Sequence, residues 1–224
     1  MSIILNIDTS IETASVSIAK DGFIQAYLVN PVQKEHASFL HNAVKQLLAS
    51  SSLDIKQMDA IAVTNGPGSY TGLRVGLASA KGLCYALHKP LITIGTLNVL
   101  AAAAIYTSGE ASTKDALFCP MLDARRMEVF TAIFDKDMNE VLPACAMILD
   151  ESLFGKLLET KRLLFFGSGA MKWKNISRSQ NAGFINELDI TVAISKLSFE
   201  KFLMNDFTDL SYSEPLYVKE FFTP

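Results

Sequence analysis

A glycine-rich segment at residues 65–76 constrains the fold of this chain more than any other part of the sequence. It reads Asn-Gly-Pro-Gly-Ser-Tyr-Thr-Gly-Leu-Arg-Val-Gly and separates a short apolar run from a segment with helical spacing. Gly66 and Gly68 permit backbone conformations that residues with a Cβ resist, and Ser69 or Thr71 can cap the helix that follows. The sequence therefore predicts a tight strand-to-helix turn, suited either to an anion at the helix N-terminus or to close packing.

Composition excludes several classes of protein. Half of the 224 residues are hydrophobic, enough for one large domain or two small ones. With 20 basic and 23 acidic residues, the chain lacks the positive charge of a free-standing nucleic-acid binder, so an RNA partner would require help from another protein. The three cysteines are far apart in apolar sequence, which predicts reduced core thiols in a cytoplasmic protein. We expect neither a signal peptide nor a membrane span.

The order of apolar runs predicts an α/β fold. An opening meander of three strands is expected to end at residues 8, 19 and 29. Helices are then expected at residues 36–50, 72–87 and 96–106, and strands at residues 58–63 and 90–94. After a polar stretch at residues 108–115, further strands are expected at residues 117–122, 128–134 and 163–166. The polar stretch predicts a boundary between two domains, residues 1–107 and residues 108–224.

The expected helix at residues 72–87 carries small residues in two rows, each with a spacing of four. The rows are Gly72, Gly76, Ala80 and Ala78, Gly82, Ala86. Each glycine inside a helix costs about 1 kcal/mol relative to alanine, so a compensating close contact is expected. The contact is made either by a neighbouring element of the same domain or by a partner subunit, and the apolar residues around the rest of the helix favour the partner.

Two predicted strands end in an aspartate. Asp8 is followed by Thr9-Ser10, and Asp123 is followed by Ala124-Arg125-Arg126. This echo suggests two related halves.

Four motifs together resemble one family. They are residues 8–10, residues 66–76, residues 123–130 and the segment Glu-Pro-Leu-Tyr-Val-Lys at residues 214–219. In this order and spacing they are similar to the TsaB (YeaZ) family, which belongs to the bacterial machinery that makes threonylcarbamoyladenosine beside the anticodon of tRNA. The resemblance implies an actin-like ATPase (ribonuclease H-like) fold of two lobes, each with a mixed β-sheet flanked by helices.

The resemblance also implies partners. They are the catalytic paralogue TsaD, in a heterodimer, and the P-loop ATPase TsaE, in a ternary complex, with a homodimer when TsaD is absent. It implies contact with tRNA only through the complex, and no membrane. The two helices at residues 36–50 and 72–87 are the expected docking surface. Its candidate residues are His36, Phe39, Leu40, Ala43, Leu47, Gly72, Arg74, Gly76, Ala80 and Leu83.

The sequence offers few candidates for catalytic or metal-binding residues. TsaD-like proteins hold a metal through two histidines four apart on a helix, whereas His36 and His41 lie about 140° apart around a helix and His88 ends another. Ser69 stands outside a Gly-x-Ser-x-Gly elbow, so helix capping is favoured over nucleophilic attack. Paired aromatic residues at 165–166 and 221–222 favour strand packing or an apolar tail over base stacking. We expect no metal, no cofactor and no peptidase activity.

The residues match a nucleotide-binding site better than they match a metal or peptidase site. In actin-like ATPases, an acidic residue at a strand end holds a metal through water while small neighbours let a hairpin approach the phosphates. Asp8 meets this description, but Asp123 is followed by bulky residues. For Arg125 we expect an interlobe or interface ion pair with a carboxylate such as Glu128 in preference to phosphate binding. The expected degenerate nucleotide site consists of Asp8, Thr9, Ser10, Ser69 and Asp123.

The sequence thus predicts a scaffold subunit without catalytic activity. The alternative is an ATP-dependent small-molecule kinase of the same fold, which would require a second competent phosphate hairpin.

Overall fold

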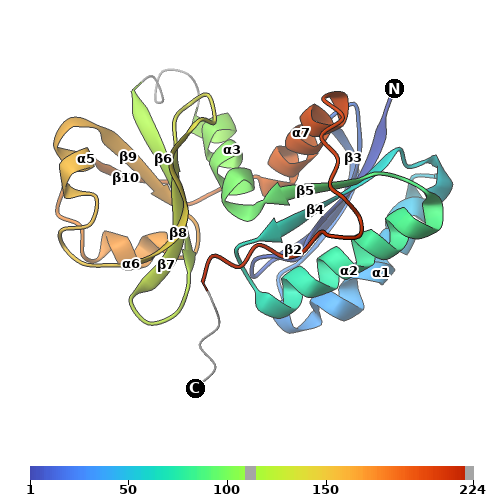
Figure 1. Ribbon diagram of the computed structural model, residues 1–224, viewed down its shortest axis with the longest axis horizontal. Helices are drawn as coiled ribbons and strands as arrows, with labels where there is room; N and C mark the ends of the chain where they lie inside the picture. The colour runs from blue at the N-terminus through green and yellow to red at the C-terminus, as the bar shows by residue number, and fades with distance from the viewer. Residues whose placement is uncertain (109–114, 220–224) are drawn as a thin grey trace. The chain divides into compact units, whose positions relative to one another are not determined.

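The computed structural model describes residues 1–108 and 115–219 and contains two five-stranded sheets (Figure 1). The chain divides into two compact units. The first consists of Met1–Thr96 and Thr191–Leu216, and the second of Leu97–Ile190 and Tyr217–Pro224. This division differs from the expected one, residues 1–107 and 108–224, because a late segment of the chain returns to the first unit. Residues 109–114, which are most of the polar stretch at residues 108–115, and the aromatic pair at residues 221–222 lie outside the described residues.

The sheet of the first unit has the order β3-β2-β1-β4-β5. Its strands are β1 (Ile3–Asp8), β2 (Ala14–Lys20), β3 (Phe23–Asn30), β4 (Ala60–Gly66) and β5 (Leu91–Gly95). The opening meander supplies the antiparallel part, and β4 and β5 extend it in parallel with β1. The expected meander is therefore confirmed, and β1 is the central strand.

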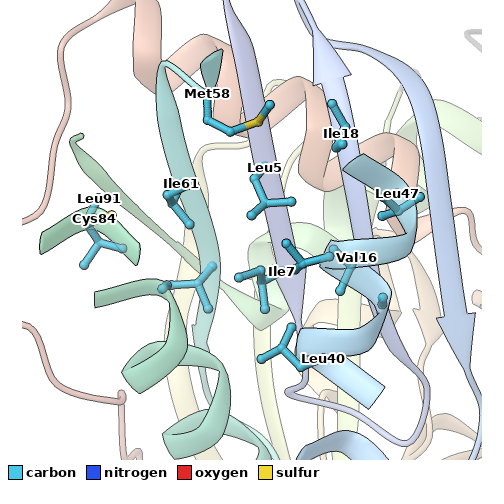
Figure 2. Close-up of a cluster of buried hydrophobic side chains, with 14 of the residues drawn as sticks. Leu5, Ile7, Val16, Ile18, Leu40, Leu47, Met58, Ile61, Cys84 and Leu91 are labelled. Carbon is cyan, nitrogen blue, oxygen red and sulfur yellow. The ribbon is translucent and has the colours of Figure 1, made fainter. Parts of the chain in front are cut away.

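Alternate side chains of β1 point to opposite faces of the first sheet. Leu5 and Ile7 are fully buried in a cluster that includes side chains of α1 (His36–Ser50) and α2 (Tyr70–Leu87), as Figure 2 shows for Leu40 and Leu47 of α1. Asn6 points to the opposite face, where its amide donates to Ser195 of α7 (Ile190–Leu203) at 3.5 Å. This polar contact and the burial of α7 explain why the helix belongs to the first unit.

The second unit repeats the topology. Its sheet has the order β10-β9-β6-β7-β8, with antiparallel pairing among β6, β7 and β8 and parallel pairing of β9 and β10. The strands are β6 (Ala116–Asp123), β7 (Glu128–Phe134), β8 (Glu140–Ile148), β9 (Arg162–Phe166) and β10 (Ala182–Phe184). The helices are α3 (Thr96–Ser108), α5 (Gly155–Thr160) and α6 (Ala170–Lys174).

The prediction of two related halves is confirmed. Asp8 ends β1 and Asp123 ends β6, and each of these strands is the centre of its sheet. No sequence pattern predicted β8, β10 or the helices α5, α6 and α7, because these elements are short or lack clear apolar periodicity. Two loops also correspond: residues 67–69 follow β4, and residues 167–169 follow β9.

The cysteines are free thiols. Burial raises the pKa of Cys84 and Cys119 to about 12, and it also raises the pKa of the partly buried Cys145. Within residues 1–108 and 115–219, no helix is both long enough and apolar enough to cross a membrane.

Candidate functional site

The glycine-rich segment forms the turn from β4 into α2. Ser69 caps the helix, since its hydroxyl oxygen accepts from the backbone N–H of Gly72 at 3.3 Å. The N–H of Ser69 in turn donates to the carbonyl oxygen of Ser10 at 2.7 Å. The predicted capping role of Ser69 is confirmed, and the segment is joined to the loop that follows β1.

The loop at Thr9 and Ser10 packs directly on this segment. A Cβ built on Gly68 would overlap the carbonyl oxygen of Ser10, and one built on Gly72 would overlap the carbonyl oxygen of Thr9. The hydroxyl of Thr9 donates to the carbonyl oxygen of Gly72 at 2.7 Å and would also collide with a Cβ on Gly76. The glycines therefore serve close packing within the unit, which is the second of the two uses that the sequence left open.

The carboxylate of Asp8 accepts hydrogen bonds from the same loop. Its carboxylate is 2% exposed, and one oxygen accepts from the N–H and the hydroxyl of Ser10 at 2.9 and 2.7 Å and from the hydroxyl of Thr64 at 2.7 Å. A carboxylate with three internal donors is a fixed structural element rather than an open ligand. The carbonyl oxygens of Thr9 and Ser10 lie against Gly72 and Gly68, so the loop that follows Asp8 is engaged in contacts within the first unit.

Asp123 has a different environment from Asp8. Its carboxylate is partly exposed, and it accepts from Lys172 at 2.5 Å and from the N–H of Arg125 at 2.6 Å. Burial raises the pKa of Asp123, but the hydrogen bonds from Lys172 and Arg125 and their charges outweigh it, so the pKa is lowered from its ordinary value. The lysine therefore neutralises this aspartate within its own unit.

Arg125 does not form the expected ion pair with Glu128 within this chain. Glu128 accepts instead from Lys219 of the same unit at 2.7 Å. Both Arg125 and Arg126 are exposed and have left-handed backbone conformations, with φ of 70° and 49°. No local sequence pattern predicts this conformation here, because the left-handed region favours glycine or asparagine.

The expected docking residues separate into two groups. His36, Leu40, Ala43, Leu47, Gly72, Gly76 and Ala80 are buried. The four with the largest apolar role, Leu40, Ala43, Leu47 and Ala80, belong to the cluster beneath the first sheet. These four residues lie on the inner sides of α1 and α2 and contact their own sheet, not the partner that the sequence predicted for them. Phe39 and Leu83 are half-buried and Arg74 is exposed.

The outer face of α2 is instead formed by Tyr70, Arg74, Ala78, Gly82, Tyr85 and Ala86, all exposed. The second row of small residues belongs to this face, and a Cβ built on Gly82 would meet no atom within 4 Å. Tyr85 is 76% exposed, and the guanidinium of Arg74 stacks over the ring of Tyr70 at 3.9 Å. The spacing of four identified both rows, but only the phase of the helix against the sheet distinguishes them.

Residues 204–216 pass beside the outer face. The ammonium of Lys81 donates to the carbonyl oxygen of Ser213 at 3.0 Å, and the neighbouring Tyr212 is 84% exposed. Further on, the N–H of Leu216 donates to the carbonyl oxygen of Asn65 at 2.7 Å. A Cβ on Gly66 would lie 2.6 Å from the carbonyl oxygen of Leu216, so the segment covers the glycine turn. The Glu-Pro-Leu-Tyr motif thus has a structural use that sequence reasoning missed.

The histidines do not form a cluster. His36 is 3% exposed and its Nε2 lies 3.1 Å from the carbonyl oxygen of Glu12, whereas His41 is exposed and lies 3.5 Å from the hydroxyl of Ser79. Among the residues that the structure describes, no three side chains of histidine, cysteine, aspartate or glutamate are grouped so that they could hold a metal ion.

Comparison with known proteins identifies the family. A family model described as TsaD, tRNA N6-adenosine threonylcarbamoyltransferase, matches residues 29–205. The protein named tRNA threonylcarbamoyladenosine biosynthesis protein TsaB in Bacillus subtilis is 30% identical over 167 residues, which are 73% of this chain and 70% of that protein. Its namesake in Escherichia coli is 33% identical over 138 residues, 62% of this chain and 57% of that protein.

A solved structure shows the same fold. The crystal structure of a Pseudomonas aeruginosa protein, described as similar to peptidase YeaZ, has a TM-score of 0.82 and 21% identity. The superposition covers 98% of this chain and all of the other. The chain therefore has the fold of this YeaZ-like structure and belongs to the family of the threonylcarbamoyltransferase model and, within it, to the TsaB (YeaZ) proteins of tRNA threonylcarbamoyladenosine biosynthesis.

Proposed function

We propose that this chain is a subunit without catalytic activity that binds and activates a TsaD-type transferase for the formation of threonylcarbamoyladenosine on tRNA. A TsaE-type ATPase completes the assembly, and the chain pairs with itself when the transferase is absent. The observation that carries the proposal is that Asp8 and the Thr9–Ser10 loop make their contacts within the first unit, which favours a structural role for this loop over phosphate binding.

The docking surface in this proposal is the outer face of α2. Tyrosine and arginine are the residue types that most often dominate binding energy at interfaces, and this face has Tyr70, Arg74 and Tyr85. The small side chains between them, Ala78 and Gly82, allow the backbone of another helix to come close. The half-buried Phe39 and Leu83 remain candidates for the margin of the same surface.

The experiment uses a glutamate on this face. Gly82→Glu places a charge where nothing lies within 4 Å, so the fold is retained while a partner helix is excluded. The matched control is Gly155→Glu in the second unit, at a glycine that also has open space around it. We expect Gly82→Glu to abolish co-purification with TsaD and the modification of tRNA, and Gly155→Glu to preserve both.

Two results would contradict the proposal. Full binding of TsaD by Gly82→Glu would remove this docking face. Modification of tRNA that proceeds equally well with the chain omitted would remove the activating role. Hydrolysis of ATP by the isolated chain would support the kinase alternative in its place.

A further inference from the structure

The hairpin that joins β6 to β7 presents two arginines on a rigid support. The N–H of Ala124 donates to the carbonyl oxygen of Glu128 at 3.0 Å, and the N–H of Glu128 returns to the carbonyl oxygen of Arg125 at 3.1 Å. Lys172 of α6 donates to the carbonyl oxygen of Arg126 at 2.7 Å. The backbone of both arginines is therefore held from within the unit, while their side chains remain exposed.

The charged groups around the hairpin leave a net charge of two positive units, carried by Arg125 and Arg126. Its two carboxylates are neutralised by lysines from elsewhere in the unit, Asp123 by Lys172 and Glu128 by Lys219. Within residues 1–108 and 115–219, neither arginine forms an ion pair. The chain as a whole has a formal net charge of −3, so this local positive charge opposes the general balance.

The backbone conformation makes the choice of residue informative. Arg125 and Arg126 occupy the left-handed region in succession, where glycine or asparagine would be less strained. Side chains that cost stability at two neighbouring positions point to a use for the charge, since surface strain of this kind accompanies functional sites. The hairpin is held by backbone hydrogen bonds, by Asp123 with Lys172 and by Glu128 with Lys219, and none of these contacts uses a guanidinium group.

We propose that Arg125 and Arg126 bind phosphates of the tRNA backbone, so that this chain contacts the RNA directly in the modifying assembly. Guanidinium groups match phosphate oxygens in geometry and charge, and phosphate contacts position a nucleic acid without reading its sequence. The inference rests on the proposed function, because it takes its RNA from there. An acidic protein surface is the competing occupant, and the test separates the two.

The test is a salt titration of tRNA binding. Each phosphate contact contributes about 0.9 to the slope of log affinity against log salt, so two contacts amount to about a tenfold change in affinity between 50 and 200 mM salt. We expect the assembly of this chain with TsaD to lose about tenfold more affinity for an unmodified tRNA transcript over this range than the assembly containing Arg125→Gly/Arg126→Gly. The double variant should also melt at a higher temperature, because it relieves two left-handed positions.

Two further variants serve as controls. Met138→Gly relieves another left-handed position, with φ of 63°, without changing charge, and should melt higher while its salt dependence stays that of the wild type. Arg125→Lys/Arg126→Lys keeps the charge and should keep the salt dependence. The titration is repeated on the chain alone, where the same difference in slope is expected at weaker affinity, so failure of TsaD to bind would remove the proposed function and leave this readout intact.

An unchanged salt dependence in Arg125→Gly/Arg126→Gly would overturn the inference. So would weaker assembly with TsaD in the absence of RNA, since the arginines would then serve a protein partner. If the chain is required for modification but the double variant modifies and binds tRNA as the wild type does, the proposed function stands and this inference fails.

Discussion

Substitution of alanine for two glycines of α2 should change stability in opposite directions. Gly72 faces the loop after β1, and a Cβ there would approach the carbonyl oxygen of Thr9 well inside the 3.0 Å that real Cβ atoms essentially never pass. Gly82 lies on the outer face of the same helix, where a Cβ would meet nothing within 4 Å. The same chemical change therefore tests the internal packing that the structure assigns to the first row of small residues.

The magnitude follows from three contributions. Overpacking against a backbone oxygen costs about 1–3 kcal/mol, and displacement of Thr9 weakens its hydrogen bond to the carbonyl oxygen of Gly72, at about 1 kcal/mol. Alanine recovers up to about 1 kcal/mol of helix propensity, less at Gly72 because it lies in the first turn. We expect Gly72→Ala to lower the free energy of unfolding by about 2–3 kcal/mol and Gly82→Ala to raise it by about 0.5–1 kcal/mol.

Urea denaturation followed by circular dichroism measures the difference. At an m value of about 2 kcal/mol/M, the midpoints of the two variants should differ by roughly 1–2 M urea. A Gly72→Ala protein as stable as the wild type would refute the packing of the Thr9 loop on α2. A destabilised Gly82→Ala protein would refute the assignment of Gly82 to an open face.

Three further predictions concern single groups. Asp8→Ala removes the acceptor of three buried hydrogen bonds and should lower the free energy of unfolding, measured by urea denaturation, by roughly 3 kcal/mol. TsaD binding should be retained under conditions in which the variant is folded. A variant as stable as the wild type would mean that the carboxylate is not structural. Because the pKa of Asp123 is lowered in the folded state, its contribution is present at neutral pH and is lost as pH falls, so the stability deficit of Lys172→Met should narrow below about pH 4; a deficit independent of pH would contradict this. The buried thiols of Cys84 and Cys119 should react with a disulfide reagent only on unfolding, whereas the partly buried Cys145 should react first, in the folded protein. Simultaneous labelling of all three cysteines would contradict this order of burial.

Local sequence signals determined most of the framework. Alternation of apolar residues identified the meander, and the spacing in the segment at residues 36–50 identified α1 with its bounds as the structure has them. Glycines and Ser69 identified the turn and cap before α2, because these depend on backbone conformations that few residues permit. The aspartates at the ends of β1 and β6 showed the internal repeat, since equivalent strands keep equivalent ends.

The candidate site was only half determined in this way. Helical spacing found two rows of small residues, but the direction of each row depends on the rotation of α2 against β1 and β4, which no local pattern encodes. The carboxylate of Asp8 is structural because Thr64, 56 residues away, donates to it, and Glu128 pairs with Lys219 rather than with Arg125 across an even larger separation. Sequence thus determined which residues could turn, cap and alternate. Tertiary structure decided which side chains are buried in the fold and which are exposed, because contacts between distant segments depend on how the strands are assembled.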